Sequence, residues 1–189
     1  ELAKGKYIAF LDSDDAWYAK KLEVQYNIME RNSHYDLSCH DSVYLNRNKF
    51  FKEQPLIDNK NSGRLINYFE LFFKNKIQTR TVMIKTNIKE RFNSNIRYSE
   101  DLDLWLRLKS SNKTIFFIDK NLAVYFKKNV SFNGLSGHVF KFWKSELKVL
   151  ARNVFNFKLL YFLLPFILLF SSFKFVIRLS KFTYLTFKE

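Results

Sequence analysis

The sequence predicts an α/β domain in which helices flank a mixed sheet, followed by a helical tail rich in apolar and basic residues. An almost wholly apolar run, Tyr7–Leu11, has the composition of a strand buried on both faces. Strand-like and helix-like segments then alternate, which is the order typical of α/β domains. From about Val139 onward the pattern is helical and separate in character. We therefore expect two parts, residues 1–138 and residues 139–189.

The expected elements follow in a regular order. After the first strand we expect a helix that reaches about Arg31, with an inward stripe of Leu22, Gln25, Tyr26 and Met29. Further strands are expected at Asp36–Leu45, Arg80–Lys85, Thr114–Ile118 and Leu122–Phe126. Two more helices are expected, one carrying Leu65, Phe69 and Phe72 after a polar stretch around Pro55–Gly63, and one at Ser99–Ser110.

Three aspartates, Asp12, Asp14 and Asp15, follow directly after the first predicted strand. In α/β sheets the ligand crevice lies beyond the carboxyl ends of the strands, so this position is informative. Neighbouring carboxylates repel one another unless a cation lies between them, and Mg²⁺ or Mn²⁺ accepts such ligands together with substrate phosphates. The structural alternative is a solvated turn in which Asp15 caps a helix starting near Ala16. The apolar strand before the motif and Trp17 after it favour the metal site.

Two other metal-dependent interpretations use the same residues. Asp12, Asp14 and Glu23 have the offsets of a calcium-binding EF-hand loop, but Trp17 occupies the position that requires glycine, so this interpretation is rejected. An apolar strand that ends in Asp-x-Asp also resembles phosphatases of the haloacid dehalogenase type. Their Gly-Thr-like continuation is replaced here by Asp-Ala-Trp, which leaves a metal-dependent phosphatase or nucleotidyltransferase as the weaker alternative.

A second acidic motif, Glu100 and Asp101, opens the predicted helix Ser99–Ser110. Ser99 has the residue type of an N-cap, and acids in the first turn interact favourably with the helix dipole, which explains the motif structurally. Helical spacing also places Asp101 on the apolar face, together with Leu104, Trp105 and Leu108. An inward-facing acid at a helix start is placed for general-base work, so both interpretations stay open.

Asp103 is expected to differ from Asp101. Its helical position points it outward to water, with Arg107 as an i,i+4 partner. We therefore expect the replacement of Asp103 by asparagine to be close to silent.

Three stretches resemble motifs of bacterial family 2 glycosyltransferases. They are the run Ala3–Asp15 with Trp17 and Lys21–Gln25 behind it, the pair Glu100–Asp101 with Leu104–Leu108 after it, and the strand Leu122–Lys127 with Ser131. Each stretch is moderately specific, and their order and separation together are strong evidence for a resemblance that covers residues 1–131.

The resemblance implies an A-type glycosyltransferase fold, a nucleotide-sugar donor and inversion at the anomeric carbon. Asp12, Asp14 and Asp15 would hold the Mn²⁺ or Mg²⁺ that neutralises the departing diphosphate. Asp101 would take the proton from an acceptor hydroxyl as that hydroxyl attacks. Glu100 would help to position the acceptor or the base.

Several departures from the family pattern refine these expectations. The upstream strands that hold the base and ribose of the nucleotide are missing, and the chain starts at Glu1, so we expect a carboxy-terminal part of such an enzyme. The loop at 127–129 lacks the histidine that many relatives carry there, and His40 and His138 are interpreted as ordinary polar residues. No Gln/Arg-x-x-Arg-Trp sequence occurs, which favours transfer of a single sugar to a glycan or lipid-linked acceptor in surface polysaccharide or lipopolysaccharide synthesis over processive synthesis.

The net charge of +14 is unevenly distributed. Residues 141–189 contain nine basic and two acidic residues, and they also hold 10 of the 22 phenylalanines. Cations mixed with bulky apolar side chains suit an anionic membrane surface better than a nucleic-acid groove. The alternative is a composition bias towards Lys, Asn, Phe and Ile. We expect a membrane surface as a partner, and no nucleic acid.

The tail contains the uncharged stretch Leu159–Phe173. As a helix it would be about 22 Å long at ~1.5 Å per residue, which is short of the roughly 30 Å hydrocarbon core. A re-entrant or interfacial segment is therefore preferred, while a single span and a helix packed on the catalytic domain stay open.

With Cys39 as the single cysteine, the composition suits a reducing compartment. We expect a cytoplasmic protein that is peripheral or monotopic at the inner face of the cell membrane, with an inactive, truncated membrane-binding remnant as the non-enzymatic alternative.

Overall fold

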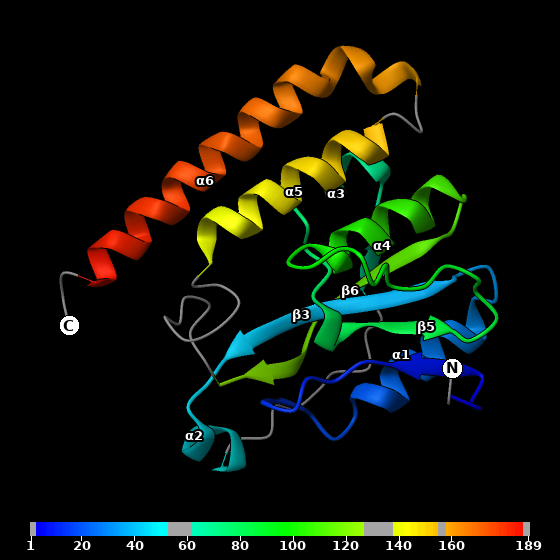
Figure 1. Ribbon diagram of the computed structural model, residues 1–189. Coiled ribbons are helices and arrows are strands. Elements are labelled where there is room, and N and C mark those ends of the chain that lie inside the picture. The colour runs from blue at the N-terminus through cyan, green and yellow to red at the C-terminus, as the bar shows by residue number, and fades with distance from the viewer. Residues whose placement is uncertain (1–2, 53–61, 127–137, 155–157, 187–189) are drawn as a thin grey trace. The chain divides into compact units, whose positions relative to one another are not determined.

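The computed structural model describes residues 3–52, 62–126, 138–154 and 158–186 (Figure 1). Its contacts divide the chain into two compact units. The sheet unit comprises Glu1–Asn67, Lys76–Glu90 and Ser111–Lys128, and the helical unit comprises Tyr68–Asn75, Arg91–Ser110 and Asn129–Glu189. The domain boundary predicted near residue 138 stays a prediction, since helices from before this position group with the tail.

The sheet unit contains the mixed sheet that the sequence predicts. Its strands are β1 (Tyr7–Ala9), β2 (Asp15–Trp17), β3 (Leu37–Tyr44), β4 (Gly63–Leu65), β5 (Met83–Lys85) and β6 (Ile115–Tyr125). The order is β1–β5–β3–β6–β2, and β4 pairs with β6 as well. Of the strand pairs that the structure describes, β3 and β6 are parallel and the others are antiparallel. The helices of this unit are α1 (Lys21–Arg31), α2 (Arg47–Lys52) and the 3₁₀ turn η1 (Thr79–Thr81).

Strand β6 joins two predicted strands, Thr114–Ile118 and Leu122–Phe126, into one. Its register with β3 shifts after His40, and Asp119 and Lys120 are the extra residues at that point. Polar residues between the two apolar runs predicted a break, whereas a bulge accommodates them without ending the strand.

Helix α1 starts later than predicted, at Lys21 instead of near Ala16. The residues from Asp15 to Trp17 form β2, because they pair with Ala123–Tyr125 of β6. Backbone pairing with a strand more than 100 residues away thus overrides the local helical pattern, which single-sequence periodicity does not detect.

The inward stripe of α1 is also different from the prediction. Leu22 and Tyr26 are exposed, and the buried residues are Lys21, Gln25, Ile28 and Met29. Gln25 is buried because it bridges two backbone segments: its Nε2 donates to the carbonyl oxygen of Ser38 at 3.1 Å and to that of Thr81 at 3.0 Å. The spacing of polar and apolar residues therefore predicted the wrong buried face for α1.

Two further expectations in the sheet unit are corrected. Leu65 lies in β4 and not in a helix, and the strand predicted at Arg80–Lys85 begins with η1 before it continues as β5. Gly63 permits the pairing of β4 with β6, since a Cβ at this position would lie 2.3 Å from the carbonyl oxygen of Phe117. Most of the polar stretch predicted at Pro55–Gly63 lies outside the described residues.

The helical unit contains the remaining helices. They are α3 (Tyr68–Phe73), α4 (Glu100–Ser110), α5 (Val139–Val154), the 3₁₀ segment η3 (Lys158–Leu163) and α6 (Leu164–Thr186). Helix α4 confirms the predicted Ser99–Ser110 helix, and α5 and α6 confirm the helical tail. Both α3 and α5 pack against α4, so α4 is buried nearly all round.

Helix α6 is longer than the uncharged stretch Leu159–Phe173 suggested. It continues through Lys174 and Arg178 for 23 residues. The segment Tyr161–Ser180, with a mean hydropathy of 1.9, is long and apolar enough to cross a membrane by length and composition alone. The single-span alternative is therefore not excluded by length.

Candidate active site

The first acidic motif lies at the carboxyl end of three strands that run in the same direction. Strands β1 and β3 both run antiparallel to β5, and β3 is parallel to β6, so β1, β3 and β6 share one direction. The chain leaves β1 and passes through Asp12 and Asp14 to Asp15, the first residue of β2 at the other end of the sheet order. The N–H of Asp15 donates to the carbonyl oxygen of Asp12 at 3.1 Å, which closes the turn. This is the sheet edge where α/β proteins bind ligands.

The three carboxylates of this turn have different surroundings. Asp12 is exposed and Asp14 is half-buried, whereas the side chain of Asp15 is only 6% exposed. An Oδ2 atom of Asp15 lies 2.9 Å from Nη1 of Arg80. Burial raises the pKa of Asp15 above its usual value, although Arg80 acts in the opposite direction. Asp15 is therefore already engaged by a cation of the protein, and Asp12 and Asp14 are the more accessible acids.

A second basic side chain, which no sequence pattern singles out, lies against the ring of Trp17. Lys21 is fully buried, and its Nζ lies 3.8 Å from the ring centroid of Trp17. Burial lowers the pKa of Lys21 to about 7. The indole N–H of Trp17 donates to the carbonyl oxygen of Arg80 at 2.8 Å, which fixes the ring in place. Arg80 thus places a positive charge beside Asp15, and Lys21 is a buried basic group against the ring of Trp17; no local sequence pattern indicates either contact.

The oxygen donors for a metal ion in the turn are the carboxylates of Asp12 and Asp14. Among the described residues, no group of three or more His, Cys, Asp or Glu side chains is arranged to hold a metal ion. Two carboxylates together with substrate phosphates are a usual set for Mg²⁺, and Asp12 and Asp14 supply such a pair. His40 is buried with its Nδ1 2.7 Å from the carbonyl oxygen of Asp41, and burial lowers its pKa to about 3. His40, interpreted from the sequence as an ordinary polar residue, is therefore a buried and neutral side chain.

The second acidic motif lies at the start of α4 in the helical unit. Asp101 is partly buried; its Oδ1 accepts the N–H of Leu102 at 2.7 Å, and its Oδ2 accepts Nδ2 of Asn75 at 3.3 Å. Burial is the main reason that the pKa of Asp101 is raised to about 6, and the neighbouring Glu100 charge adds to it. A carboxylate with this pKa is ionised at neutral pH yet more basic than an ordinary aspartate, which suits a general base.

The backbone before α4 is strained. Tyr98 has a φ of 79°, a left-handed conformation that non-glycine residues rarely adopt. Such strain is typical of functional sites, where the surrounding structure maintains it. Glu100 is partly buried, and its Oε2 has no hydrogen-bond partner among the described residues. An acceptor atom of this kind is available for a substrate hydroxyl or a water molecule.

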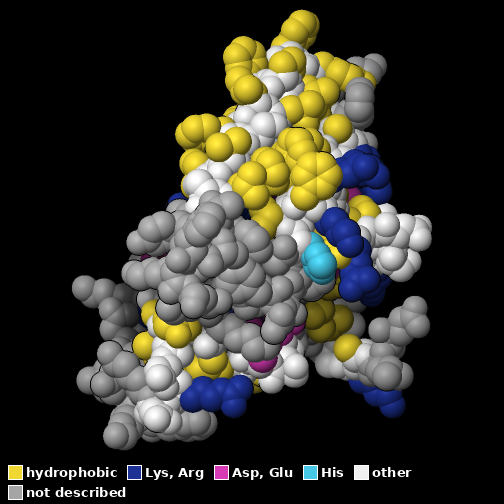
Figure 2. Space-filling model, turned by 60° about the vertical axis from the view of Figure 1, so that its left-hand side comes forward, with side chains coloured by type: hydrophobic (Ala, Val, Ile, Leu, Met, Phe, Trp, Pro, Cys, Tyr) yellow, Lys and Arg dark blue, Asp and Glu magenta, His cyan; other side chains and the backbone are white. Residues whose placement is uncertain are grey.

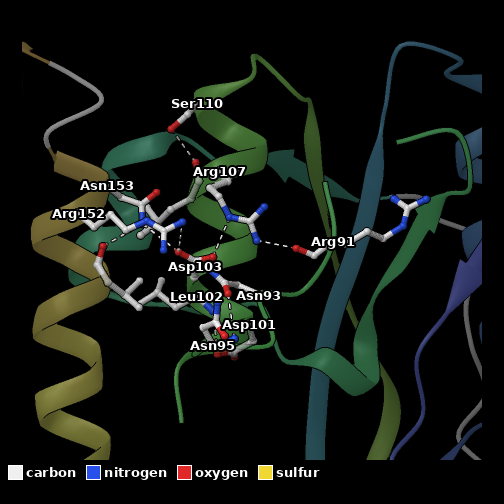
Figure 3. A network of polar contacts seen from close by, with 12 residues as sticks. Arg91, Asn93, Asn95, Asp101, Leu102, Asp103, Arg107, Ser110, Arg152 and Asn153 are labelled. Carbon is white, nitrogen blue, oxygen red and sulfur yellow. Dashed lines mark hydrogen bonds and ion pairs between the residues drawn. The ribbon is translucent and has the colours of Figure 1, made fainter. Parts of the chain in front are cut away.

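Asp103 does not face water as the sequence analysis expected. Its side chain is fully buried in a polar network between α4 and α5, drawn in Figure 3. Asp103 Oδ2 accepts Nε of Arg107 at 2.7 Å, which confirms the i,i+4 pair, and Oδ1 lies 3.8 Å from Nη2 of Arg152 and 3.5 Å from Nδ2 of Asn153. The prediction was wrong because α4 is covered on more than one side, as its leucines off the main stripe, Leu102 and Leu106, could have indicated.

Replacement of Asp103 by asparagine should therefore destabilise the chain, contrary to the silent change expected above. Arg107 and Arg152 would lose their counter-charge, while 22% and 52% of their side chains reach solvent and limit the loss. We expect the free energy of unfolding to fall by about 2–3 kcal/mol. Urea unfolding followed by circular dichroism measures it, with the exposed Asp119→Asn as a matched control within about 0.5 kcal/mol of wild type. Equal midpoints for Asp103→Asn and wild type would contradict the network's role.

Comparison with known proteins identifies the family. Residues 1–105, more than half of the chain, match the glycosyl transferase family 2. The chain belongs to this family. The match includes both acidic motifs, and together with the mixed sheet it confirms the fold class predicted from the sequence.

Three relatives illustrate how far this similarity extends. An uncharacterized glycosyltransferase of Rickettsia conorii is 35% identical over 128 residues, which are 64% of this chain and 20% of that protein. The Escherichia coli UDP-Glc:alpha-D-GlcNAc-diphosphoundecaprenol beta-1,3-glucosyltransferase WfgD is 30% identical over 175 residues, covering 88% of this chain and 63% of WfgD. The E. coli enzyme WfaP, which carries the same activity name, is 31% identical over 58% of this chain and 41% of WfaP.

The family 2 chain thus spans between a fifth and about two thirds of the length of these relatives. The match to WfgD covers too much of the chain to be confined to residues 1–138, so it reaches the helical tail. The loop at 127–129 and Ser131, to which the sequence analysis gave meaning, lie outside the described residues.

Proposed function

We propose that the protein carrying this chain transfers a single sugar from a nucleotide-sugar donor to a hydroxyl group of a glycan or lipid-linked acceptor, with inversion at the anomeric carbon. The observation that carries the proposal is the acidic turn Asp12–Asp15 at the shared carboxyl end of β1, β3 and β6 in a family 2 chain. Donor diphosphates are bound at this sheet edge in α/β proteins, and acidic residues there serve them through a divalent cation.

Asp12 and Asp14 are the residues that would hold Mn²⁺ or Mg²⁺ beside the donor. Both lie in the turn after β1 that the Asp15–Asp12 backbone hydrogen bond closes, where Asp12 is exposed and Asp14 is half-buried. The cation would supply charge neutralisation for the departing diphosphate. The prediction that Asp15 is a third ligand stays a prediction, because its carboxylate is paired with Arg80. As long as that pair holds, Asp15 fixes the turn in place.

Asp101 is the proposed general base. Its carboxylate takes the proton from the acceptor hydroxyl, the hydroxyl oxygen forms a bond to the anomeric carbon, and the bond from that carbon to the diphosphate breaks. The electron pair of the broken bond leaves with the nucleoside diphosphate. The raised pKa of about 6 supports this role, since the carboxylate stays ionised at neutral pH and holds a proton better than an ordinary aspartate. Glu100, with its unpartnered buried Oε2, would position the acceptor hydroxyl or the base.

The relatives and the tail support the proposed acceptor class. WfgD and WfaP are named for a diphosphoundecaprenol-linked acceptor, and the similarity to WfgD reaches the helical tail. A lipid-linked acceptor would require the enzyme to work at a membrane surface. We therefore propose a peripheral or monotopic location at the inner face of the cell membrane, in the synthesis of a surface polysaccharide.

The test is a transfer assay on the longer protein that carries this chain together with its upstream nucleotide-binding strands, using radiolabelled nucleotide sugars, beginning with UDP-glucose, and a diphosphoundecaprenol-linked N-acetylglucosamine acceptor. We expect transfer that needs Mn²⁺ or Mg²⁺, stops with EDTA and returns when the metal is restored. Transfer that survives thorough chelation would contradict the metal role. Hydrolysis of a phosphomonoester without sugar transfer would instead support a phosphatase, and inactivity with every donor would support an inactive remnant.

A further inference from the structure

The apolar side chains of the last helix form a continuous exposed stripe. Phe166, Leu169, Phe173 and Val176 of α6 are between 59% and 70% exposed. At 3.6 residues per turn they occupy an arc of roughly 80° on one side of the helix. Figure 2 shows apolar side chains gathered over the upper part of the view, where Figure 1 places the start of α6. A contiguous set of exposed apolar side chains of this kind marks an interaction surface.

The opposite side of α6 is bound to α5. Ile167 and Ser171 are buried there, and Trp143 of α5 stacks on Phe175 at a centroid distance of 4.6 Å. A single carboxylate, Glu146 of α5, holds two cations of α6. Its Oε1 lies 2.6 Å from Nζ of Lys174, and its Oε2 lies 3.1 Å from Nη1 of Arg178.

Among the side chains of α6 that the structure describes, the charged ones, Lys174 and Arg178, are both bound to Glu146, and the stripe on the other side of the helix carries no charge. Glu146 is 3% exposed and is the one acidic residue between positions 138 and 186, against eight lysines and arginines. Among the described residues of this helix pair, no carboxylate is therefore free to repel an anionic surface. Lys141, Lys144 and Lys148 of α5 are exposed.

We infer that α5 and α6 form a monotopic membrane-docking hairpin: α6 lies in the plane of an anionic bilayer with its stripe of Phe166, Leu169, Phe173 and Val176 in the acyl region, while Glu146 holds its charged side away from the lipid. The inference deepens the membrane location of the proposed function. It gives that location a specific face of the chain and excludes the single span left open above.

The two ion pairs of Glu146 with Lys174 and Arg178 exclude a membrane-spanning arrangement of α6. While Glu146 binds Lys174 and Arg178, the strongly basic α5 stays packed along α6, and its exposed lysines cannot enter hydrocarbon. Only the segment from Tyr161 to Phe173 would then be free to cross. It has 13 residues and is about 20 Å long at ~1.5 Å per residue, which is too short for the roughly 30 Å core. A flat helix has no such conflict.

The binding test uses the full chain without donor or acceptor, so its outcome is independent of sugar transfer. Flotation with 1:1 phosphatidylglycerol/phosphatidylcholine vesicles should recover the wild type, and pure phosphatidylcholine or high salt should reduce the bound fraction. The double variant Leu169→Asp/Phe173→Asp should lose at least about tenfold in partitioning, with an unchanged circular dichroism spectrum. Leu22→Asp/Tyr26→Asp, which adds the same charges to exposed apolar positions of α1, is the matched control and should bind as the wild type does.

The orientation test measures how deeply two labelled positions of α6 lie in the bilayer. Phe166→Cys and Val176→Cys are each labelled with a fluorophore, and quenching by lipids brominated at different depths is compared; the buried Cys39 is left in place. A flat helix gives equal depths, whereas a spanning helix separates the two labels by about 15 Å at ~1.5 Å per residue. Absence of binding to the anionic vesicles, wild-type binding by the Leu169→Asp/Phe173→Asp variant, or a depth difference of this size would each overturn the inference. Concentration-dependent dimers that the same variant abolishes, with no vesicle binding, would assign the stripe to a second copy of the chain instead.

Discussion

Replacement of Asp101 by asparagine should lower turnover by roughly 10²- to 10⁴-fold, with donor affinity unchanged and without loss of stability at neutral pH. Asparagine keeps the volume of Asp101 and can still accept the N–H of Leu102, but it cannot take a proton. Burial raises the pKa of Asp101 from 3.8 to about 6, so its ionised form is unfavourable in the folded chain. Removal of that charge should therefore increase the free energy of unfolding at pH 7 by about 1–2 kcal/mol, after allowance for the solvent that still reaches the side chain.

The pH dependence of stability and that of activity both follow from the raised pKa of Asp101. Between about pH 4 and pH 6 the folded chain holds a proton on Asp101 that the unfolded chain has already lost. This group therefore favours folding below pH 4, and that contribution is lost as the pH rises through 6. Activity moves in the opposite direction, since the base must be ionised: kcat/KM should fall as the pH drops through about 6, and the asparagine variant should lack this step.

Turnover, thermal unfolding and pH profiles of the wild type and Asp101→Asn separate catalysis from helix capping. If Asp101 only favours the start of α4, the variant keeps its activity and loses up to about 1 kcal/mol of stability. The exposed Asp119→Asn is the control in place of Asp103→Asn, which the buried network of Asp103 makes unsuitable. A fully active Asp101→Asn enzyme would end the proposed mechanism while leaving the fold intact.

Local patterns in the sequence predicted the existence of several strands and helices. The strand β1, the helix α4 with its acidic first turn, and the helical tail all follow from composition and spacing within about ten residues. The predicted burial of β1 on both faces was wrong, because β1 is the end strand of the sheet order and is only partly buried. Prediction failed where distant backbone pairing decided the outcome. Asp15–Trp17 became a strand because β6 was available to pair with it, and Leu65 did so for the same reason.

Sequence patterns also failed to predict the side-chain contacts in the candidate site. The acidic residues were found from their position after a strand and before a helix, but their partners were not. Arg80 beside Asp15, Asn75 beside Asp101 and Arg152 beside Asp103 are each separated from the acid by at least 26 positions, and no periodicity connects them. A charged side chain that a helical wheel places on the solvent side can still be buried when another helix covers that side, as α5 does for Asp103. Such burial depends on tertiary packing and is not visible in the sequence.

Replacement of Asp14 by alanine should reduce transfer by about 10³-fold, since loss of a metal-binding carboxylate removes several kcal/mol of transition-state stabilisation. Asp14 is half-buried in the turn that the Asp15–Asp12 backbone bond closes, so its loss should change the fold little. Transfer is measured against Mn²⁺ concentration, and the concentration for half-maximal activity should rise. Asp15→Asn is the informative companion: a structural role predicts a lower free energy of unfolding through the lost Arg80 pair and an unchanged Mn²⁺ requirement, whereas a ligand role predicts a rise like that of Asp14→Ala. Undiminished transfer by Asp14→Ala would show that this turn does not hold the metal.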